Sequence, residues 1–111
     1  MSDPRTFFED HAPAVLRGRI KLALPDDVVV LFHIQGDGGG TWQVDSRVDP
    51  VEIGPVTEGP KDCQIWCSAV DFMGILKGTL DARRAFLGGK LRVVGDVGLA
   101  VRLQGVLAPE A

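Results

Sequence analysis

The alternation of apolar and polar side chains predicts two strands joined by a tight turn in the first half of the chain. Residues 28–34 form a run of β-branched and aromatic side chains, which is typical of a strand that is apolar on both faces. Residues 41–45 alternate, so that Trp42 and Val44 lie on one face. The glycine-rich stretch 37–40 favours a turn, and the two strands are therefore predicted to form a hairpin.

Three further strands are predicted. Residues 47–53 predict a weaker strand at a sheet edge, because Pro50 lacks the N–H that a central strand must donate. A loop with two prolines and two glycines follows at 54–62. Residues 63–67 and 90–94 then have the composition and spacing of strands.

The strand at 63–67 has a clear register. Cys63, Ile65 and Cys67 lie on one face and Trp66 on the other, because side chains alternate along a strand. If the cysteine-bearing face packs against helices, Trp66 lies on the open face of the sheet. We therefore expect Trp66 to be partly exposed, or covered only by a second subunit in a homodimer.

The N-terminal segment carries a helix signal. Asp3 followed by Pro4 provides a capping side chain and a proline at the first helical position. Pro13 predicts a kink or break, and Gly18 is suited to end the helix. The apolar stripe is predicted to consist of Phe7, Phe8, His11, Val15 and Leu16.

Two shorter helices are predicted near the middle of the chain. The pattern Ser68-x-x-Asp71 predicts a helix start, and Gly78 fits the residue that ends the helix. Asp81 then caps a short helix that ends near Gly88.

Local rules leave the last segment open between a strand and a helix. The alternation of Val97, Leu99, Val101 and Leu103 predicts a strand after a turn at Gly95-Asp96. Equally, Asp96 can cap a helix whose one face carries Leu99, Leu103 and Val106. Arg102 is the one charged residue between positions 97 and 107, so either structure is expected to be mostly covered.

The composition predicts a single soluble domain. The 111-residue chain is 45% hydrophobic and 24% charged, which is ordinary for a globular protein and fits one domain over residues 1–111. Its longest stretch without Asp, Glu, Lys or Arg, residues 28–36, is far shorter than the roughly 20 residues of a membrane helix. Because no signal peptide is visible, a cytoplasmic location is expected.

The charge distribution bears on partners. The net charge of −3 disfavours nucleic-acid binding, which needs a basic domain. Residues 22–71 contain nine acidic and two basic side chains, whereas residues 72–111 contain six basic and three acidic ones. This basic C-terminal third is either ordinary solvated surface or a site of weak attraction to an anionic membrane.

The two cysteines are interpreted as buried free thiols. Cys63 and Cys67 lie four residues apart in a strand, which separates them by about 13 Å. A disulfide needs Cα atoms within about 7 Å. Only His11 and His33 could complete a metal site with them, so no metal ligand set is expected.

The sequence contains no convincing catalytic constellation. Neither histidine lies at a sharp turn of the kind that presents a catalytic base. The glycines at 36–40 lack the Lys-Ser/Thr pair and the strand-to-helix context of a phosphate-binding loop. The residues therefore favour a binding module without a cofactor over an enzyme.

The second half of the chain resembles the sterol carrier protein type-2 family. The motifs that carry the resemblance are Asp71-Phe72-x-x-Ile75-Leu76-Lys77-Gly78-x-Leu80-Asp81, Ala85-Phe86-x-x-Gly89-Lys90-Leu91-x-Val93-x-Gly95-Asp96 and Leu99-Ala100-x-x-Leu103-Gln104. Upstream, Phe32-His33-Ile34-x-Gly36 and Gly39-Gly40-x-Trp42 fit the family's first hairpin. The resemblance covers roughly residues 28 to 107.

This resemblance implies an α+β fold: a five-stranded, mainly antiparallel sheet covered on one face by helices, with an apolar tunnel between sheet and helices. It also implies that residues 97–107 form a helix. Members of the family bind fatty acids, fatty acyl-CoA esters, sterols or phospholipids. The implied tunnel-lining residues are Phe32, Val44, Ile65, Cys67, Phe72, Ile75, Leu76, Phe86, Leu91, Val93, Leu99 and Leu103.

Three functions therefore compete. The first is a non-catalytic module that binds and transfers a lipid. The second is a small enzyme that acts on an apolar substrate in the same cavity, with His33 or Cys67 as its titratable group. The third is a protein-interaction module whose cavity is vestigial.

Overall fold

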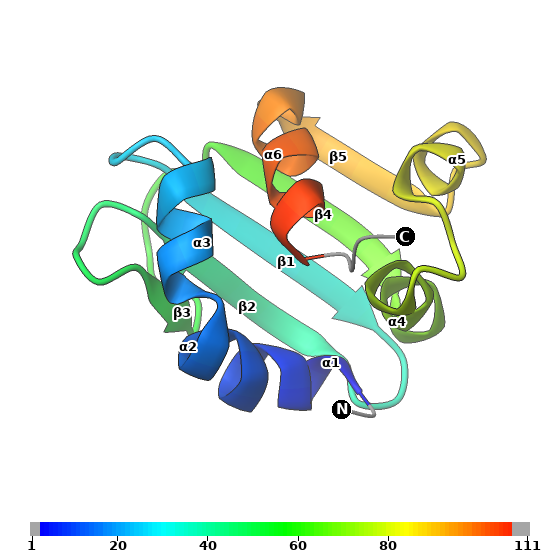
Figure 1. The fold of residues 1–111 in the computed structure, drawn as a ribbon. Coiled ribbons are helices and arrows are strands. Elements are labelled where there is room, and N and C mark those ends of the chain that lie inside the picture. The colour runs from blue at the N-terminus through cyan, green and yellow to red at the C-terminus, as the bar shows by residue number, and fades with distance from the viewer. Residues whose placement is uncertain (1–2, 108–111) are drawn as a thin grey trace.

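The computed structural model describes residues 3–107, which form an α+β fold around a single mixed sheet. The sheet has five strands in the order β3-β2-β1-β4-β5. These are β1 (Val29–Gln35), β2 (Gly40–Asp45), β3 (Glu52–Gly54), β4 (Cys63–Ser68) and β5 (Leu91–Gly95). Strands β1 and β4 are parallel and the other neighbours are antiparallel. The helices cover one face of the sheet (Figure 1), which confirms the expected architecture.

The helices after the sheet's first four strands begin and end where the sequence predicts. They are α4 (Ala69–Lys77), α5 (Ala82–Leu87) and α6 (Val97–Leu107). The hydroxyl of Ser68 accepts a hydrogen bond from the N–H of Asp71, and Gly78 ends α4 in the left-handed conformation. The carboxylate of Asp81 caps α5. Capping is local chemistry, which explains why these boundaries are legible in the sequence.

The N-terminal helical segment is longer than predicted. It consists of α1 (Pro4–Thr6), a π-helical turn η1 (Phe7–His11), α2 (Ala12–Val15) and α3 (Arg17–Ala23). Gly18 does not end the helix, and the chain instead bends at Leu16, between α2 and α3. Figure 1 shows α3 running steeply away from the direction of the first helical turns. The wide turn precedes Pro13, whose ring needs room and which has no N–H to donate.

The π-helical turn changes which side chains are buried. It inserts one extra residue into the helix, so the buried positions continue from Phe8 to Ala12, Leu16 and Ile20. His11 and Val15, which the sequence placed in the apolar stripe, are therefore exposed.

Strand β3 is shorter than the predicted strand over 47–53, because the chain turns sharply after β2. The backbone N–H and the guanidinium of Arg47 both donate to the carboxylate of Asp45, at 2.8–2.9 Å. The guanidinium of Arg47 holds the pKa of Asp45 below its usual value.

The register of β4 is as predicted. Trp66 is half-buried on the face that the helices leave open. Its ring stacks on that of His33, with centroids 4.5 Å apart, and the guanidinium of Arg92 lies over it. These three side chains occupy one row across β1, β4 and β5.

Gly95 and Asp96 resolve the ambiguity at the last segment. A side chain at Gly95 would lie 2.5 Å from the carbonyl oxygen of Asp62, so only glycine fits there. The N–H of Asp96 donates to that same carbonyl, and the Asp96 carboxylate accepts from the N–H of Gly98. The chain is thus fastened beside the start of β4 and begins α6 as a capped helix instead of a hairpin.

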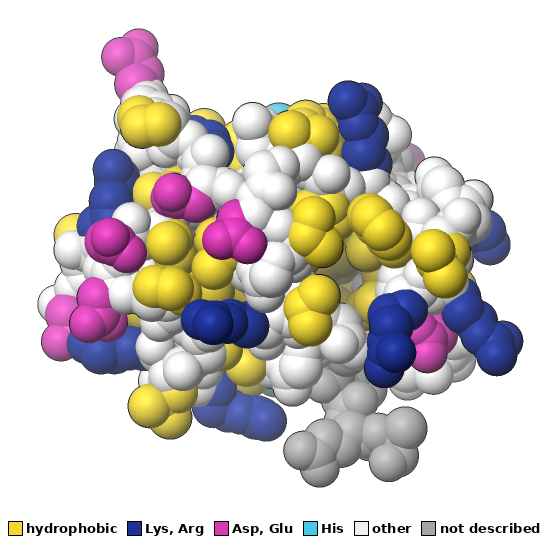
Figure 2. All heavy atoms as spheres, turned by 90° about the horizontal axis from the view of Figure 1, so that it is seen from above, with side chains coloured by type: hydrophobic (Ala, Val, Ile, Leu, Met, Phe, Trp, Pro, Cys, Tyr) yellow, Lys and Arg dark blue, Asp and Glu magenta, His cyan; other side chains and the backbone are white. Residues whose placement is uncertain are grey.

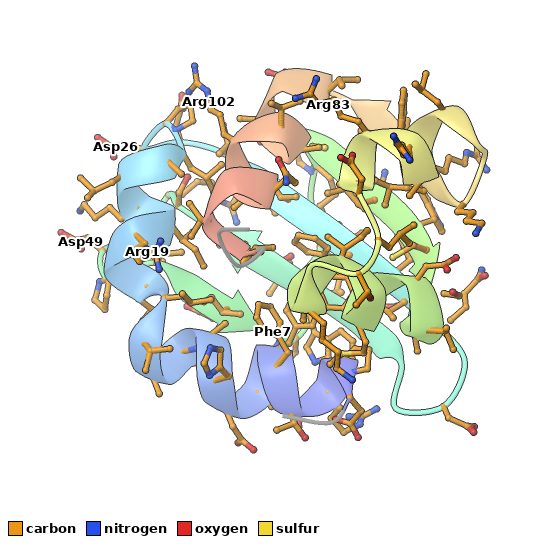
Figure 3. All side chains as sticks on the ribbon, turned by 45° about the vertical axis from the view of Figure 1, so that its right-hand side comes forward. Phe7, Arg19, Asp26, Asp49, Arg83 and Arg102 are labelled. Carbon is orange, nitrogen blue, oxygen red and sulfur yellow. The ribbon has the colours of Figure 1, made fainter. Side chains whose placement is uncertain are left out.

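The space between the helices and the sheet is filled at one end of the molecule and open at the other. Under the N-terminal helices an aromatic cluster fills the space between helices and sheet: Phe7, Phe8, Phe32, Trp42 and Phe72. Figure 3 shows Phe7 directed from its helical turn into this interior. At the other end, where α5, β5 and α6 meet, large apolar side chains remain exposed.

Candidate functional site

An apolar cavity with a volume of about 440 Å³ lies between α5, β5 and α6. Its walls are Ala82, Arg83, Phe86, Leu87, Leu91, Val93, Val97, Ala100, Val101 and Gln104. Figure 2 looks onto this end of the molecule and shows hydrophobic side chains gathered around a hollow in the surface. The local sequence explains the space, because α5 is only six residues long and leaves part of β5 uncovered.

A second, inner cavity of about 50 Å³ lies deeper, between the sheet and helices α4 and α6. It is lined by Phe32, Ile65, Phe72, Ile75, Leu76, Ala82, Leu91, Ala100, Leu103, Gln104 and Leu107. Four residues line both cavities: Ala82, Leu91, Ala100 and Gln104. The two cavities are therefore neighbours that share a wall.

Nine of the twelve predicted lining residues do line these cavities. Phe86 and Val93 line the outer one, Leu91 lines both, and six line the inner one: Phe32, Ile65, Phe72, Ile75, Leu76 and Leu103. Phe86 is 43% exposed and lies at the mouth of the outer cavity.

Val44, Cys67 and Leu99 are not among the walls of either cavity. Val44 lies on β2, two strands away from β5, where the sheet packs under the N-terminal helices. Cys67 on β4 lies on the same face as Cys63 and Ile65, and Leu99 lies on α6; both side chains are buried in the core. These three residues are core residues in the structure.

Sequence reasoning missed several wall residues: Ala82, Arg83, Leu87, Val97, Ala100, Val101, Gln104 and Leu107. The signal for some of them was present, because residues 97–107 are apolar nearly all round. We expected that segment to be mostly covered, yet Val97 and Val101 are exposed at the mouth. Both side chains border the open outer cavity and are not covered by other side chains.

Among residues 3–107, Arg83 and Gln104 are the polar side chains in the wall of the outer cavity, and Arg83 is the charged one. Arg83 extends from α5 toward the first turns of α6, whereas Arg102 lies on the far side of α6 and points away from the cavity (Figure 3). Arg102 is exposed, whereas Leu99 and Leu103, which the sequence placed on one face of this helix, are buried.

The two residues proposed as titratable groups of an enzyme lie outside both cavities. His33 is on the open face of the sheet, where its Nε2 lies 3.1 Å from Oε1 of Gln64. Cys67 is enclosed in the core, and burial raises the pKa of its thiol to about 12. A thiol with this pKa is protonated at neutral pH and is a poor nucleophile.

Metal binding and membrane spanning were also considered. Within residues 3–107, no group of three or more His, Cys, Asp or Glu side chains is placed to hold a metal ion. None of the helices in this part of the chain combines the length and apolar character needed to cross a membrane.

The chain is a small α+β domain in which helices cover one face of a five-stranded sheet and an apolar cavity opens between α5, β5 and α6. The family model described as the SCP-2 sterol transfer family matches residues 19–108, and the chain belongs to this family. The resemblance drawn from the sequence motifs is thereby confirmed.

Similar proteins support this assignment. The chain is 31% identical over 81 residues to human "Sterol carrier protein 2", which covers 70% of this chain and 15% of that protein. It is 30% identical over 95 residues to human "Hydroxysteroid dehydrogenase-like protein 2", and the match covers 79% of this chain and 23% of that protein. The chain thus spans less than a quarter of the length of these relatives.

The fold is also found among solved structures. The structure of sterol carrier protein 2 from Yarrowia lipolytica in its apo form superposes with a TM-score of 0.64 at 27% identity. The superposition covers 93% of this chain and 82% of the yeast chain. The similarity therefore includes the N-terminal helices as well as the sheet.

Proposed function

We propose that this protein binds a lipid chain in the two neighbouring cavities, without catalysis, and transfers it between membranes. The observation that carries the proposal is the outer cavity of about 440 Å³, whose walls are apolar except for two side chains. Pockets of roughly 300–1,000 Å³ with mostly apolar walls are typical of small-molecule sites. Burial of an alkyl chain there would contribute about 0.8 kcal/mol per CH₂.

The family supports the same function. The family to which the chain belongs is described by sterol transfer, and the relatives named above include a sterol carrier protein. The enzymatic alternative lacks the titratable group that it requires in the cavity, because neither His33 nor Cys67 is among the cavity walls. The alternative of a vestigial cavity requires a tightly filled core, which the open end at α5 and α6 does not have.

The experiment is to extract the purified protein with organic solvent and to identify bound lipids by mass spectrometry. We expect a lipid at close to one equivalent, or, for protein stripped of lipid, saturable binding of a fluorescent fatty acid or sterol. Protein that carries no lipid and binds neither fluorescent ligand would contradict the proposed function.

We further propose that the cavity mouth contacts the membrane surface during transfer. Four large apolar side chains surround the mouth and are exposed: Phe86, Leu87, Val97 and Val101. Exposed apolar groups beside basic ones favour an anionic bilayer, and the basic residue at the mouth is Arg83, which is exposed and lines the outer cavity. We also propose a cytoplasmic location. The free thiols of Cys63 and Cys67 are compatible with a reducing compartment.

Leu87→Asp is expected to slow lipid transfer between vesicles containing phosphatidylserine by about tenfold or more, because it puts a negative charge at the mouth. Leu87 is 83% exposed, so the fold should be unaffected. Val70→Asp is the matched control, since Val70 is 82% exposed but lies on α4, away from the outer cavity. Transfer is measured by energy transfer between labelled vesicles. Equal slowing by both variants would contradict a membrane contact at the mouth.

A further inference from the structure

The edge strand β5 directs a row of backbone groups away from the sheet. It pairs with β4 on one side, and its other side is an edge of the sheet. The N–H of Asp96 donates to the carbonyl of Asp62, which lies opposite it at the end of the β4–β5 ladder. Hydrogen-bonded pairs alternate with non-hydrogen-bonded pairs along an antiparallel ladder. The N–H and C=O groups of Leu91 and Val93 therefore point away from β4.

The two edges of the sheet differ in how well they resist pairing with another strand. The opposite edge, β3, has three residues, with Pro50 before it and Pro55 directly after it. Proline blunts an edge because it has no N–H to donate. Strand β5 has five residues without proline, and all five are half-buried or exposed. Strand β5 is therefore the edge that can accept another strand.

We propose that β5 pairs with β5 of a second copy of this chain, so that two sheets join into one continuous sheet across a two-fold axis. Two-fold symmetry makes this pairing antiparallel, because the same surface of both copies takes part. Val93 lies opposite Val93 of the second copy, and Leu91 lies opposite Gly95 of the second copy. This register brings the outward-directed backbone groups of both copies together.

Charge complementarity selects this register over its neighbours. It places Lys90 opposite Asp96 of the second copy, and the two-fold axis repeats the pair. Both residues are exposed, and within residues 3–107 neither forms a salt bridge in the single chain. A shift by two residues in one direction places Arg92 opposite Arg92 of the second copy, and like charges in this position destabilise a sheet. The opposite shift pairs Leu91 with Val97, which belongs to α6.

Apolar side chains beside the strand extend the contact. Helix α5 precedes β5 and α6 follows it, on the same face of the sheet (Figure 1). Antiparallel pairing therefore brings α5 of one copy toward α6 of the other. Phe86 and Leu87 on α5 and Val97 and Val101 on α6 are between 43% and 83% exposed. Association would remove these side chains from water, which favours the dimer.

The dimer and the proposed membrane contact use the same side chains. Leu87 is covered in the dimer and exposed in the single chain, so the single chain is the form that meets a bilayer through the cavity mouth. The dimer itself rests on the backbone and the charges of β5 and does not require a bound lipid. Dimerisation and lipid binding can therefore fail independently of each other.

Sedimentation equilibrium and amide hydrogen exchange of the full chain test the pairing. We expect a dimer with a dissociation constant of about 10–100 µM, in keeping with a small interface. At a concentration well above this range, the amides of Leu91 and Val93 should exchange at least about tenfold more slowly than in the dilute protein. The amides of Arg92 and Val94 should change less, because they already face β4.

Lys90→Glu is expected to weaken dimerisation by about tenfold or more, because it places a second carboxylate opposite Asp96. Lys90 is exposed, so the fold should be unaffected. Lys77→Glu is the matched control, since it makes the same change of charge at an exposed position on α4. Adding Asp96→Asn to Lys90→Glu should restore part of the affinity, because asparagine removes the repulsion and still caps α6.

Three outcomes would overturn the proposal. The first is a chain that remains monomeric at the highest concentration tested. The second is a dimer in which exchange at Leu91 and Val93 is unchanged, and a concentration-dependent change in Trp66 fluorescence would then place the contact on the open face of the sheet. The third is equal weakening by Lys90→Glu and Lys77→Glu, which would show that overall charge and not the β5 edge governs association.

Discussion

Leu103→Asp is expected to destabilise the protein by about 3–5 kcal/mol and to abolish lipid retention. Leu103 is 1% exposed and lies on α6, where its side chain forms part of the inner cavity wall. In the described part of the chain, none of the other residues that line this cavity carries a positive charge that could pair with the new carboxylate. A buried charge without a partner carries a desolvation cost of this size. The free energy of unfolding is measured by urea denaturation.

Arg102→Asp is the control for this prediction. Arg102 is adjacent in sequence but exposed, so its replacement should change the free energy of unfolding by less than about 0.5 kcal/mol. It should also reduce attraction to anionic vesicles slightly, because it replaces a positive charge with a negative one. Similar unfolding midpoints for the two variants would show that α6 does not bury Leu103 in solution.

The parts of the fold that the sequence predicted are those controlled by local chemistry. The hairpin of β1 and β2 follows from a glycine turn between two apolar runs, and the caps at Ser68 and Asp81 follow from their own side chains. The half-buried position of Trp66 follows from strand alternation alone.

The parts that local rules could not settle depend on distant contacts. Residues 97–107 alternate like a strand, and the helix is fixed by the hydrogen bond from Asp96 to the carbonyl of Asp62. The family resemblance supplied the correct answer there. In the N-terminal segment, the wide turn before Pro13 moved His11 out of the apolar stripe, which no 3.6-residue period predicts.

The cavity could be predicted as a set of residues but not residue by residue. Leu91 and Val44 are both apolar strand residues that face the helices, yet only Leu91 meets open space. The difference lies in what covers them, because the N-terminal helices fill the space above β2 whereas the short α5 does not fill the space above β5. Arg83 was missed because an arginine on a short helix is indistinguishable from a solvated surface residue in sequence.

The aromatic cluster at the closed end of the molecule is the basis of the last prediction. The ring of Phe8 stacks on Trp42 of β2 with centroids 4.7 Å apart and on Phe72 of α4 at 5.3 Å. It also contacts Phe32 of β1 at 5.0 Å and Phe7 at 5.1 Å. Phe8 therefore packs the N-terminal helices against both the sheet and α4.

Phe8→Ala is expected to reduce the free energy of unfolding by about 3–5 kcal/mol, because it removes apolar contacts and leaves a void among rigid rings. Leu22→Ala is the control, since Leu22 is 90% exposed on α3 and its replacement should change stability by less than about 0.5 kcal/mol. Phe8 lines neither cavity, so the folded fraction of the variant should bind a fluorescent fatty acid with unchanged affinity. A loss of less than about 1 kcal/mol would show that the cluster repacks around the missing ring, and a selective loss of ligand affinity would show that the lipid site extends to this end of the sheet.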